Sequence, residues 1–159
     1  MDYIYSDRNE YFKRDKNARC AFCQAQLKPD GFDNLILHRG EHSFVIMNLY
    51  PYNSGHMMVV PNNHTNVLSL LPAEQLAEMI QLIQKAINVL TKLYCPQGFN
   101  IGVNLGEAGG AGIKEHLHWH VIPRWSGDAN FITVIGKTRV LPESLEESYQ
   151  KLIETWGSI

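Results

Sequence analysis

The sequence has no long hydrophobic run and almost no excess of charge. None of its apolar stretches reaches the length of about 20 residues that a membrane-spanning helix requires. The first 20 residues are polar and mixed in charge, so we expect no secretory signal there. The formal net charge of −2 gives no reason to expect nucleic-acid binding or attraction to an anionic membrane. These absences predict a globular protein whose partners are neither nucleic acids nor membranes.

Cysteines and the common nucleotide-binding glycine motifs are also scarce. The chain has three cysteines, which cannot form an even disulfide framework, so we expect a reducing compartment, namely the cytoplasm. Neither GxxxxGK(S/T) nor GxGxxG occurs, which excludes the P-loop and the dinucleotide-binding fingerprint.

The hydrophobic patterns predict an α+β domain built on an antiparallel sheet. We expect an irregular N-terminal arm over residues 1–19 and one domain over residues 20–159. Residues 35–61 are typical of two or three strands, with a turn at PYNSG. Apolar residues at three- and four-residue steps predict a long core helix over residues 72–94.

Two further elements follow the long helix. The alternation in FNIGVNL predicts a half-buried strand over residues 99–105. Apolar residues after Pro142 predict a C-terminal helix. His38 and His42 flank a predicted hairpin turn, and we expect both to be solvated.

Three histidines alternate with apolar residues in the segment EHLHWHVIPRW. Residues two apart share a face of a β-strand but not of a helix. We therefore predict a strand whose His116, His118 and His120 side chains line one face, while the apolar residues between them pack into the core. A solvated strand face would ordinarily carry threonine, lysine or glutamate, so three imidazoles indicate a functional site.

A glycine-rich loop, GEAGGAGIKE, leads directly into these histidines. Glycine lets backbone N–H groups approach a ligand because no Cβ obstructs the approach. The loop is either a flexible hairpin connection or a cradle for phosphate oxygens, and its position beside three imidazoles favours the cradle. Gly110 and Gly112 are the candidate phosphate-binding residues.

The segment HLHWHVI matches the signature of the histidine triad (HIT) family, in which three histidines alternate with apolar residues. The segments NLYPYNSGHMMVVPNNH, GGAGIKEHLHWHVIPRW and GDANF also resemble that family, and the resemblance runs from about Cys20 to Phe131. It implies a HIT-like fold with an antiparallel sheet, a long helix and a C-terminal helix. It also implies a homodimer, formed through the long helix or the sheet edge. The longer HVIPRWSGDANF resembles family members that hydrolyse or phosphorolyse diadenosine polyphosphates.

The resemblance implies roles for individual residues. The middle histidine of the family motif is the nucleophile, which is His118 here, and a neutral imidazole is nucleophilic near neutral pH. His120 would hydrogen-bond the phosphate and help to protonate the leaving group. Asn48 corresponds to a ribose-binding residue, and His56 and Asn104 correspond to further groups that line the pocket. Both asparagines could equally be turn or strand-edge residues.

Cys20 and Cys23 form a C-x-x-C motif, with His64 as a distant partner. Three interpretations are open: a thioredoxin-like redox pair, two ordinary reduced cysteines, or a structural zinc site. In zinc-containing members of the family that the chain resembles, the first triad histidine completes the site. The resemblance therefore implies the zinc ligands Cys20, Cys23, His64 and His116. Mg²⁺ could accompany the nucleotide substrate.

These observations predict an enzyme that is a nucleotide hydrolase or transferase. We expect it to attack the α-phosphate of a dinucleoside polyphosphate, such as diadenosine tetraphosphate, through a nucleotidyl–histidine intermediate. Water and phosphate are both open as acceptors. The alternatives are a nucleoside phosphoramidase and a zinc-structured nucleotide-binding protein with little turnover. A hydrolase with catalytic metal ligands in HxH is disfavoured, because no acidic residue follows to balance the charge of the metal.

One departure from the family pattern bears on the substrate. Some members have a serine or threonine just before the triad, where it contacts phosphate, and this chain has Gly112 and Ile113 in that stretch. Either backbone N–H groups supply the contact, or the substrate preference differs.

Overall fold

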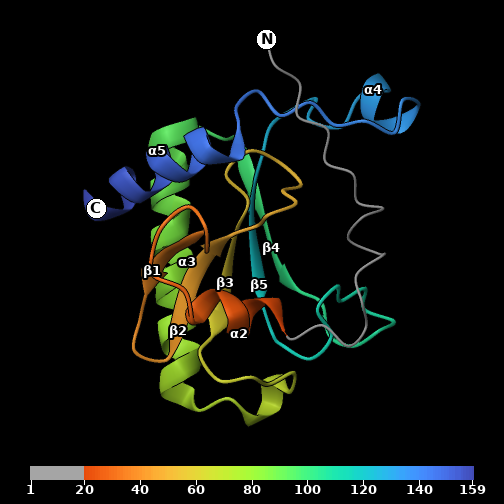
Figure 1. Cartoon of the computed structure of the whole chain (residues 1–159). Coiled ribbons are helices and arrows are strands. Elements are labelled where there is room, and N and C mark those ends of the chain that lie inside the picture. Colours follow the sequence, from red (N-terminus) through yellow and green to blue (C-terminus); the bar gives the residue numbers. More distant parts are fainter. Residues whose placement is uncertain (1–19) are drawn as a thin grey trace.

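The computed structural model describes residues 20–159, so the predicted arm over residues 1–19 lies outside the described residues. The centre of the protein is a five-stranded antiparallel sheet with the strand order β1-β2-β3-β5-β4 (Figure 1). The strands are β1 (Ile36–Arg39), β2 (Ser43–Met47), β3 (Met57–Pro61), β4 (Gly98–Val103) and β5 (Trp119–Arg124). The prediction of an α+β fold on an antiparallel sheet is confirmed.

The middle and the edge of the sheet differ in burial. All five residues of β2 and all five of β3 are buried. A strand that is covered on both faces requires continuous apolar sequence rather than alternation, and SFVIM and MMVVP come close to this. By contrast, β4 is an edge strand, because among residues 20–159 only β5 pairs with it.

Helix α3 (Ala73–Tyr94) is the long helix that the sequence predicts, and it packs on β2, β3 and β5. Met79, Ile83 and Leu90 of the predicted apolar stripe are buried, whereas Ile80 lies half exposed on the other side of the helix. Burying side chains of this size stabilises a fold by about 1.5–3 kcal/mol each. The helix therefore forms one wall of the core.

Helix α5 (Leu145–Gly157) packs against α3 and β1 (Figure 1). Its first turn is fixed by a reciprocal capping arrangement, in which Ser144 Oγ accepts the Glu147 N–H at 3.1 Å and the Glu147 carboxylate accepts the Ser144 N–H at 2.8 Å. The predicted C-terminal helix is thus present and begins three residues after Pro142.

The two faces of the sheet carry different side chains. On β1, His38 packs on Trp156 of α5 with ring centroids 5.5 Å apart, so His38 is partly buried and the expectation that it is solvated holds only in part. The strand register puts Val121 on this same helix-covered face. His120, the preceding residue of β5, must then point to the opposite face, because neighbours on a strand alternate.

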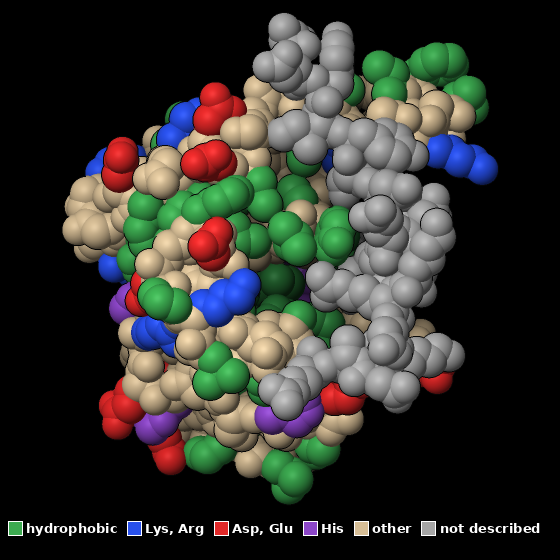
Figure 2. Space-filling view, viewed as in Figure 1, with side chains coloured by type: hydrophobic (Ala, Val, Ile, Leu, Met, Phe, Trp, Pro, Cys, Tyr) green, Lys and Arg blue, Asp and Glu red, His purple; other side chains and the backbone are tan. Residues whose placement is uncertain are grey.

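Short helices occur at three further places, and the sequence patterns predict none of them. They are α2 (Ala21–Gln26), the 3-10 turn η1 (Leu68–Leu70) and α4 (Phe131–Val134). Helix α4 stands apart from the sheet and carries the exposed apolar side chains of Phe131, Ile132 and Val134 (Figures 1 and 2). None of the helices in residues 20–159 combines the length and the apolar character that crossing a membrane would demand.

Candidate active site and metal centre

The three histidines of the triad are buried, with exposed fractions of 1% for His116, 5% for His118 and 8% for His120. The prediction that one strand carries all three is wrong in its bounds, because β5 begins only at Trp119. His116 and His118 lie in the irregular segment before it, where the Leu117 N–H donates to the Thr65 carbonyl at 2.7 Å. This segment pairs with the loop after β3 rather than with a neighbouring strand. His116 and His120 consequently belong to two different side-chain clusters.

His118 is held in one tautomer by the backbone of its own segment. Its Nδ1 lies 2.8 Å from the His116 carbonyl oxygen, and because a carbonyl can only accept, Nδ1 carries the proton. The other nitrogen, Nε2, is therefore a lone pair when the ring is neutral. Burial lowers the pKa of His118 below its ordinary value, although the bond to the carbonyl raises it in part. The ring is thus neutral and presents Nε2 as a base or nucleophile near neutral pH.

His120 lies at the end of a hydrogen-bond chain that fixes its tautomer as well. The backbone N–H of Tyr52 donates to His56 Nδ1 at 3.1 Å, so the proton of the neutral His56 ring sits on Nε2. His56 Nε2 lies 2.9 Å from His120 Nδ1, which must accept that proton. A neutral His120 therefore carries its own proton on Nε2. Burial, and then repulsion from the His118 ring when that ring is protonated, lower the pKa of His120 to about 4.

Asn48 belongs to the same chain. Its Oδ1 accepts the Tyr50 N–H at 3.0 Å, which turns the Nδ2 group toward His56 Nδ1, 3.3 Å away. This contact adds a second donor to the same nitrogen. Asn48 thus lies beside the His56–His120 pair, at the end of β2 where the sequence interpretation places a substrate-contacting residue.

The glycine loop is shaped by hydrogen bonds within itself. Asn104 Nδ2 donates to the Gly110 carbonyl at 3.2 Å, and the Gly110 N–H donates to the Glu107 carbonyl at 3.0 Å. Gly110 has a φ of +81°, which an L side chain rarely adopts. Its N–H is therefore engaged in the turn itself. The Gly112 N–H donates to no group among residues 20–159 and is the better candidate for a phosphate contact.

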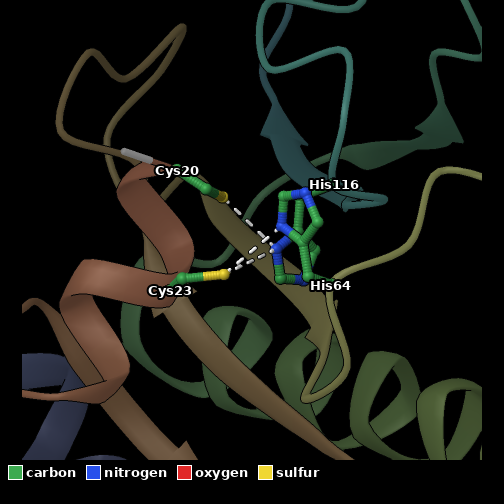
Figure 3. A group of neighbouring side chains, drawn as sticks. All are labelled: Cys20, Cys23, His64 and His116. Carbon is green, nitrogen blue, oxygen red and sulfur yellow. Dashed lines mark hydrogen bonds between the residues drawn. The ribbon is translucent and has the colours of Figure 1, made fainter. Parts of the chain in front are cut away.

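A second cluster joins the four residues that the sequence interpretation names as zinc ligands. Figure 3 shows Cys20 and Cys23 at the start of α2 pointing toward His64, on the loop after β3, and His116, just before β5. Cys20 Sγ lies 3.4 Å from His116 Nδ1, and Cys23 Sγ lies 3.3 Å from His64 Nδ1 and 3.6 Å from His116 Nδ1. All four ligand atoms lie within 4.8 Å of one another.

The spacing of these atoms fits a tetrahedral metal ion. Zinc bonds of about 2.3 Å to sulfur and about 2.0 Å to nitrogen, at tetrahedral angles, put these two ligand types about 3.5 Å apart. The three measured sulfur–nitrogen distances lie close to that value. His116 Nε2 donates to the Pro61 carbonyl at 2.9 Å, so its Nδ1 is a lone pair aimed at both sulfurs. The group could hold one metal ion.

The protonation of the cysteine thiols also favours a bound metal ion. Burial, and then the neighbouring Cys20, raise the pKa of the Cys23 thiol, so two adjacent thiolates are unfavourable without a cation between them. A divalent ion would offset that charge and displace the protons.

Two contributors to these clusters lie beyond what sequence reasoning found. The Phe22 ring lies between the clusters, 5.4 Å from His116 and 5.1 Å from His118 by ring centroids. Tyr52 supplies the backbone N–H that orients His56, and its ring stacks on His120 at 5.7 Å. The large apolar side chain between the two cysteines of CAFC could have indicated that Phe22 packs against the triad. A backbone donor such as Tyr52 leaves no mark in the sequence.

Known proteins resemble this chain in sequence and in structure. An AP-4-A phosphorylase of Mycobacterium tuberculosis is 42% identical over 150 residues, which cover 91% of this chain and 76% of that protein. The asymmetrical bis(5'-nucleosyl)-tetraphosphatase of Schizosaccharomyces pombe is 29% identical over 93 residues, covering 58% of this chain and 50% of that protein. A Zn-bound histidine triad family protein of Mycobacterium smegmatis superposes with a TM-score of 0.69 at 27% identity, covering 87% of this chain and 94% of that chain. The HIT domain model matches residues 32–127, and the chain belongs to the HIT family.

Proposed function

We propose that this protein is a nucleotidyl transferase that splits dinucleoside polyphosphates, with diadenosine tetraphosphate as the representative substrate and inorganic phosphate as the acceptor. The observation that carries the proposal is His118, whose Nδ1 proton is committed to the His116 carbonyl and whose Nε2 is left as a lone pair. The similarity to an AP-4-A phosphorylase over 91% of the chain supports the substrate class and the acceptor.

In the first step, His118 Nε2 attacks the α-phosphorus of one nucleotide. A P–N bond forms, the bridging P–O bond breaks, and its electron pair leaves with the other nucleotide as a polyphosphate anion. For diadenosine tetraphosphate this product is ATP. The Nδ1 proton stays on the His118 ring, hydrogen-bonded to the carbonyl, so the intermediate is a nucleotidyl-imidazolium that departs readily in the next step.

In the second step, an oxygen of inorganic phosphate attacks the same phosphorus and the P–N bond breaks. The electron pair returns to His118 Nε2, and the product is ADP. Water in place of phosphate would give AMP through the same intermediate. The two acceptors therefore differ in product but not in the role of His118.

His120 would serve as a hydrogen-bond donor to the phosphate chain. Its neutral tautomer carries the proton on Nε2, because Nδ1 accepts from His56. Such a donor stabilises the negative charge that builds up on the leaving oxygen. The leaving group is itself a polyphosphate anion, so the step requires no complete proton transfer from the ring.

Three further residues would shape the substrate pocket. Asn48 would contact the ribose from the end of β2, where it already orients His56. Asn104 would hold the glycine loop in place through the Gly110 carbonyl. The Gly112 N–H would then contact a phosphate oxygen, in the place where other family members use a hydroxyl side chain.

We also propose that Cys20, Cys23, His64 and His116 hold a structural zinc ion. Four protein ligands leave no open position for substrate, so the ion would cross-link three segments rather than take part in the reaction. None of the three cysteines is in a disulfide, which favours a reducing, cytoplasmic setting. Residues 20–159 offer no second group of metal ligands, so any Mg²⁺ would arrive with the polyphosphate.

Residues 20–159 would act as one domain, and two copies would associate through β4. The outer edge of β4 is unpaired by any strand of residues 20–159 and exposes Ile101. Pairing two such edges would satisfy backbone groups that an edge strand leaves to water. Substituting Ile101 by lysine should shift the mass measured by light scattering toward the monomer, and an unchanged mass would exclude this edge as the contact.

The test is to incubate the protein with diadenosine tetraphosphate, with and without inorganic phosphate, and to follow products by phosphorus NMR. The expected products are ADP and ATP, formed only when phosphate is present. AMP and ATP in both reactions would assign a hydrolase instead. No turnover in either reaction would contradict the proposed function.

A further inference from the structure

Asn53 lies in the loop between β2 and β3, next to the end of β5, and is buried with an exposed fraction of 6%. Its carboxamide uses every polar atom. Nδ2 donates to the Pro123 carbonyl at 2.9 Å and to Asp128 Oδ2 at 2.8 Å, and Oδ1 accepts from the Arg139 guanidinium. An asparagine with both donated protons and its oxygen engaged is fixed in orientation.

The partners of Asn53 come from three separate segments. Pro123 lies in β5, Asp128 in the turn that follows it, and Arg139 in the segment after α4. Asp128 is itself held by a bidentate contact from Arg124, at 2.6 and 2.8 Å. The Arg124 guanidinium, together with Asn53, holds the pKa of Asp128 well below its usual range, so this carboxylate is charged. Asn53 is thus anchored to a rigid group.

Asn53 directly follows the residue whose backbone N–H orients His56. Asn53 follows Tyr52, whose N–H donates to His56 Nδ1, and the Asn53 carbonyl accepts the backbone N–H of His56 at 3.2 Å. Moving Asn53 would therefore turn the Tyr52 N–H away from the ring. The Asn48 Nδ2 contact at 3.3 Å would still favour a lone pair on His56 Nδ1, so only part of the molecules would move the proton to Nδ1, and in these His120 would have to donate through its own Nδ1. His120 Nε2 would then face the phosphate chain as a lone pair.

We propose that Asn53, anchored by Asp128 and Arg139, is a positioning residue that keeps the His56–His120 pair in the tautomer that donates a hydrogen bond to the substrate. This inference rests on the proposed function for its effect on turnover. Its effect on the tautomers can be measured without any substrate. It also links the segment after α4 to the pair, since Arg139 is more than 15 residues beyond the triad in sequence and its guanidinium donates to Asn53 Oδ1.

The first experiment compares Asn53→Ala with the parent protein in two ways. Long-range proton–nitrogen NMR of histidine-labelled protein reads which ring nitrogen carries the proton. Parent protein should show His56 and His120 protonated on Nε2, and the variant should show mixed tautomers. For diadenosine tetraphosphate, kcat should fall about 10²-fold while KM changes little, as expected for a displaced catalytic donor.

Arg139→Met gives a second variant that spares the buried carboxamide. Arg139 lines a cavity of about 850 Å³, so guanidinium from solution can reach the vacated position. We expect kcat to fall about tenfold through loss of one charged hydrogen bond, and millimolar guanidinium to restore most of it. Lys151→Met is the matched control, because Lys151 lines the same cavity but pairs with Glu143; its kcat should match the parent.

Either of two results would overturn the inference. One is an Asn53→Ala protein whose His56 and His120 tautomers match the parent, even if its kcat falls, since a fall alone would follow from a purely structural role. The other is a kcat for folded Arg139→Met equal to that of Lys151→Met. If the parent protein turned over no dinucleoside polyphosphate, the proposed function would fail, and the tautomer comparison would still decide whether Asn53 positions the pair.

Discussion

His116 and His118 lie two residues apart, and backbone carbonyls hold their neutral rings in opposite tautomers. In the metal-ligand cluster, the Pro61 carbonyl accepts the Nε2 proton of His116, so that Nδ1 faces two sulfurs. In the catalytic cluster, the His116 carbonyl accepts the Nδ1 proton of His118, so that Nε2 is the lone pair. The backbone carbonyl that a histidine meets thus decides which of its two ring nitrogens presents a lone pair.

The His56–His120 pair shows a third arrangement, in which one imidazole ring donates a hydrogen bond to another. Two ring nitrogens 2.9 Å apart could be two converging lone pairs, as in a metal site. The Tyr52 N–H on the far side of His56 excludes that, because it forces a proton onto the nitrogen between the rings. This pair is therefore a donor–acceptor chain, and its free end is a hydrogen-bond donor.

Removing the nucleophile should give the largest effect and leave the metal cluster intact. His118→Ala should lower kcat for diadenosine tetraphosphate by about 10⁴-fold or more, while the protein still binds AMP and keeps its metal content. His42→Ala, a half-exposed histidine outside both clusters, is the control and should match the parent. Steady-state kinetics and metal analysis make the measurement. Turnover by His118→Ala at the parent rate would exclude the covalent mechanism.

Removing a metal ligand should reverse this pattern, with a large loss of stability and a smaller loss of rate. Parent protein should contain about one zinc per chain, and Cys23→Ser should contain almost none. When free zinc exceeds its dissociation constant a thousandfold, binding stabilises the fold by about 4 kcal/mol, and the variant should lose this in urea unfolding. Cys95→Ser is the control, since Cys95 is exposed and far from the cluster in sequence. A parent protein purified with less than a tenth of one zinc per chain, and indifferent to chelators, would rule out the site.

Acid should destabilise the fold partly through His120. Its pKa is about 4 in the folded protein and about 6.5 in the unfolded chain, so the unfolded chain binds more protons between these values. The contribution is fully present above pH 6.5 and is lost as pH falls toward 4, by about 3 kcal/mol in total. Urea unfolding of parent and His120→Asn across this range should show a steeper pH dependence for the parent. His56 and His118 face this ring and are coupled to it, so the difference between the two curves reports the loss of His120 together with the change that it causes in the titration of its two neighbours. Parallel curves would contradict the assigned burial effect.

Loosening the glycine loop should give the smallest effect. Asn104→Ala removes the hydrogen bond to the Gly110 carbonyl at a half-buried position. We expect KM to rise several-fold with kcat nearly unchanged, and the free energy of unfolding to fall by no more than about 1 kcal/mol. Kinetics at saturating and limiting substrate distinguish the two parameters. A large fall in kcat would mean that the loop orients the reacting atoms and not only the bound phosphate.

Long periodic segments and paired motifs were readable from the sequence. The stripe that buries Met79, Ile83 and Leu90 has the helical period, and the apolar runs of β2 and β3 end at recognisable turns. The four predicted metal ligands come from three segments of the chain and do meet in one cluster. Each of these features is either local in sequence or carried by the family motif.

The features that decide the chemistry were not readable in this way. The tautomers of His116, His118 and His120 depend on backbone groups such as the Pro61 carbonyl, which any residue type would provide, and the Tyr52 N–H, which any residue type except proline would provide. The bounds of β5 depend on the pairing of Leu117 with the loop after β3, not on alternation. Helices as short as α2 and α4 offer too few residues for a periodic signal.

The most direct test is to trap the intermediate. Protein mixed with diadenosine tetraphosphate in the absence of phosphate is quenched, digested and analysed by mass spectrometry for an adenylyl group on the peptide that contains His118. We predict one adenylyl group on His118, which disappears when phosphate is added before the quench and is absent from His118→Ala. Turnover without any such adduct, or an adduct on a different residue, would contradict the assignment of His118 as the nucleophile.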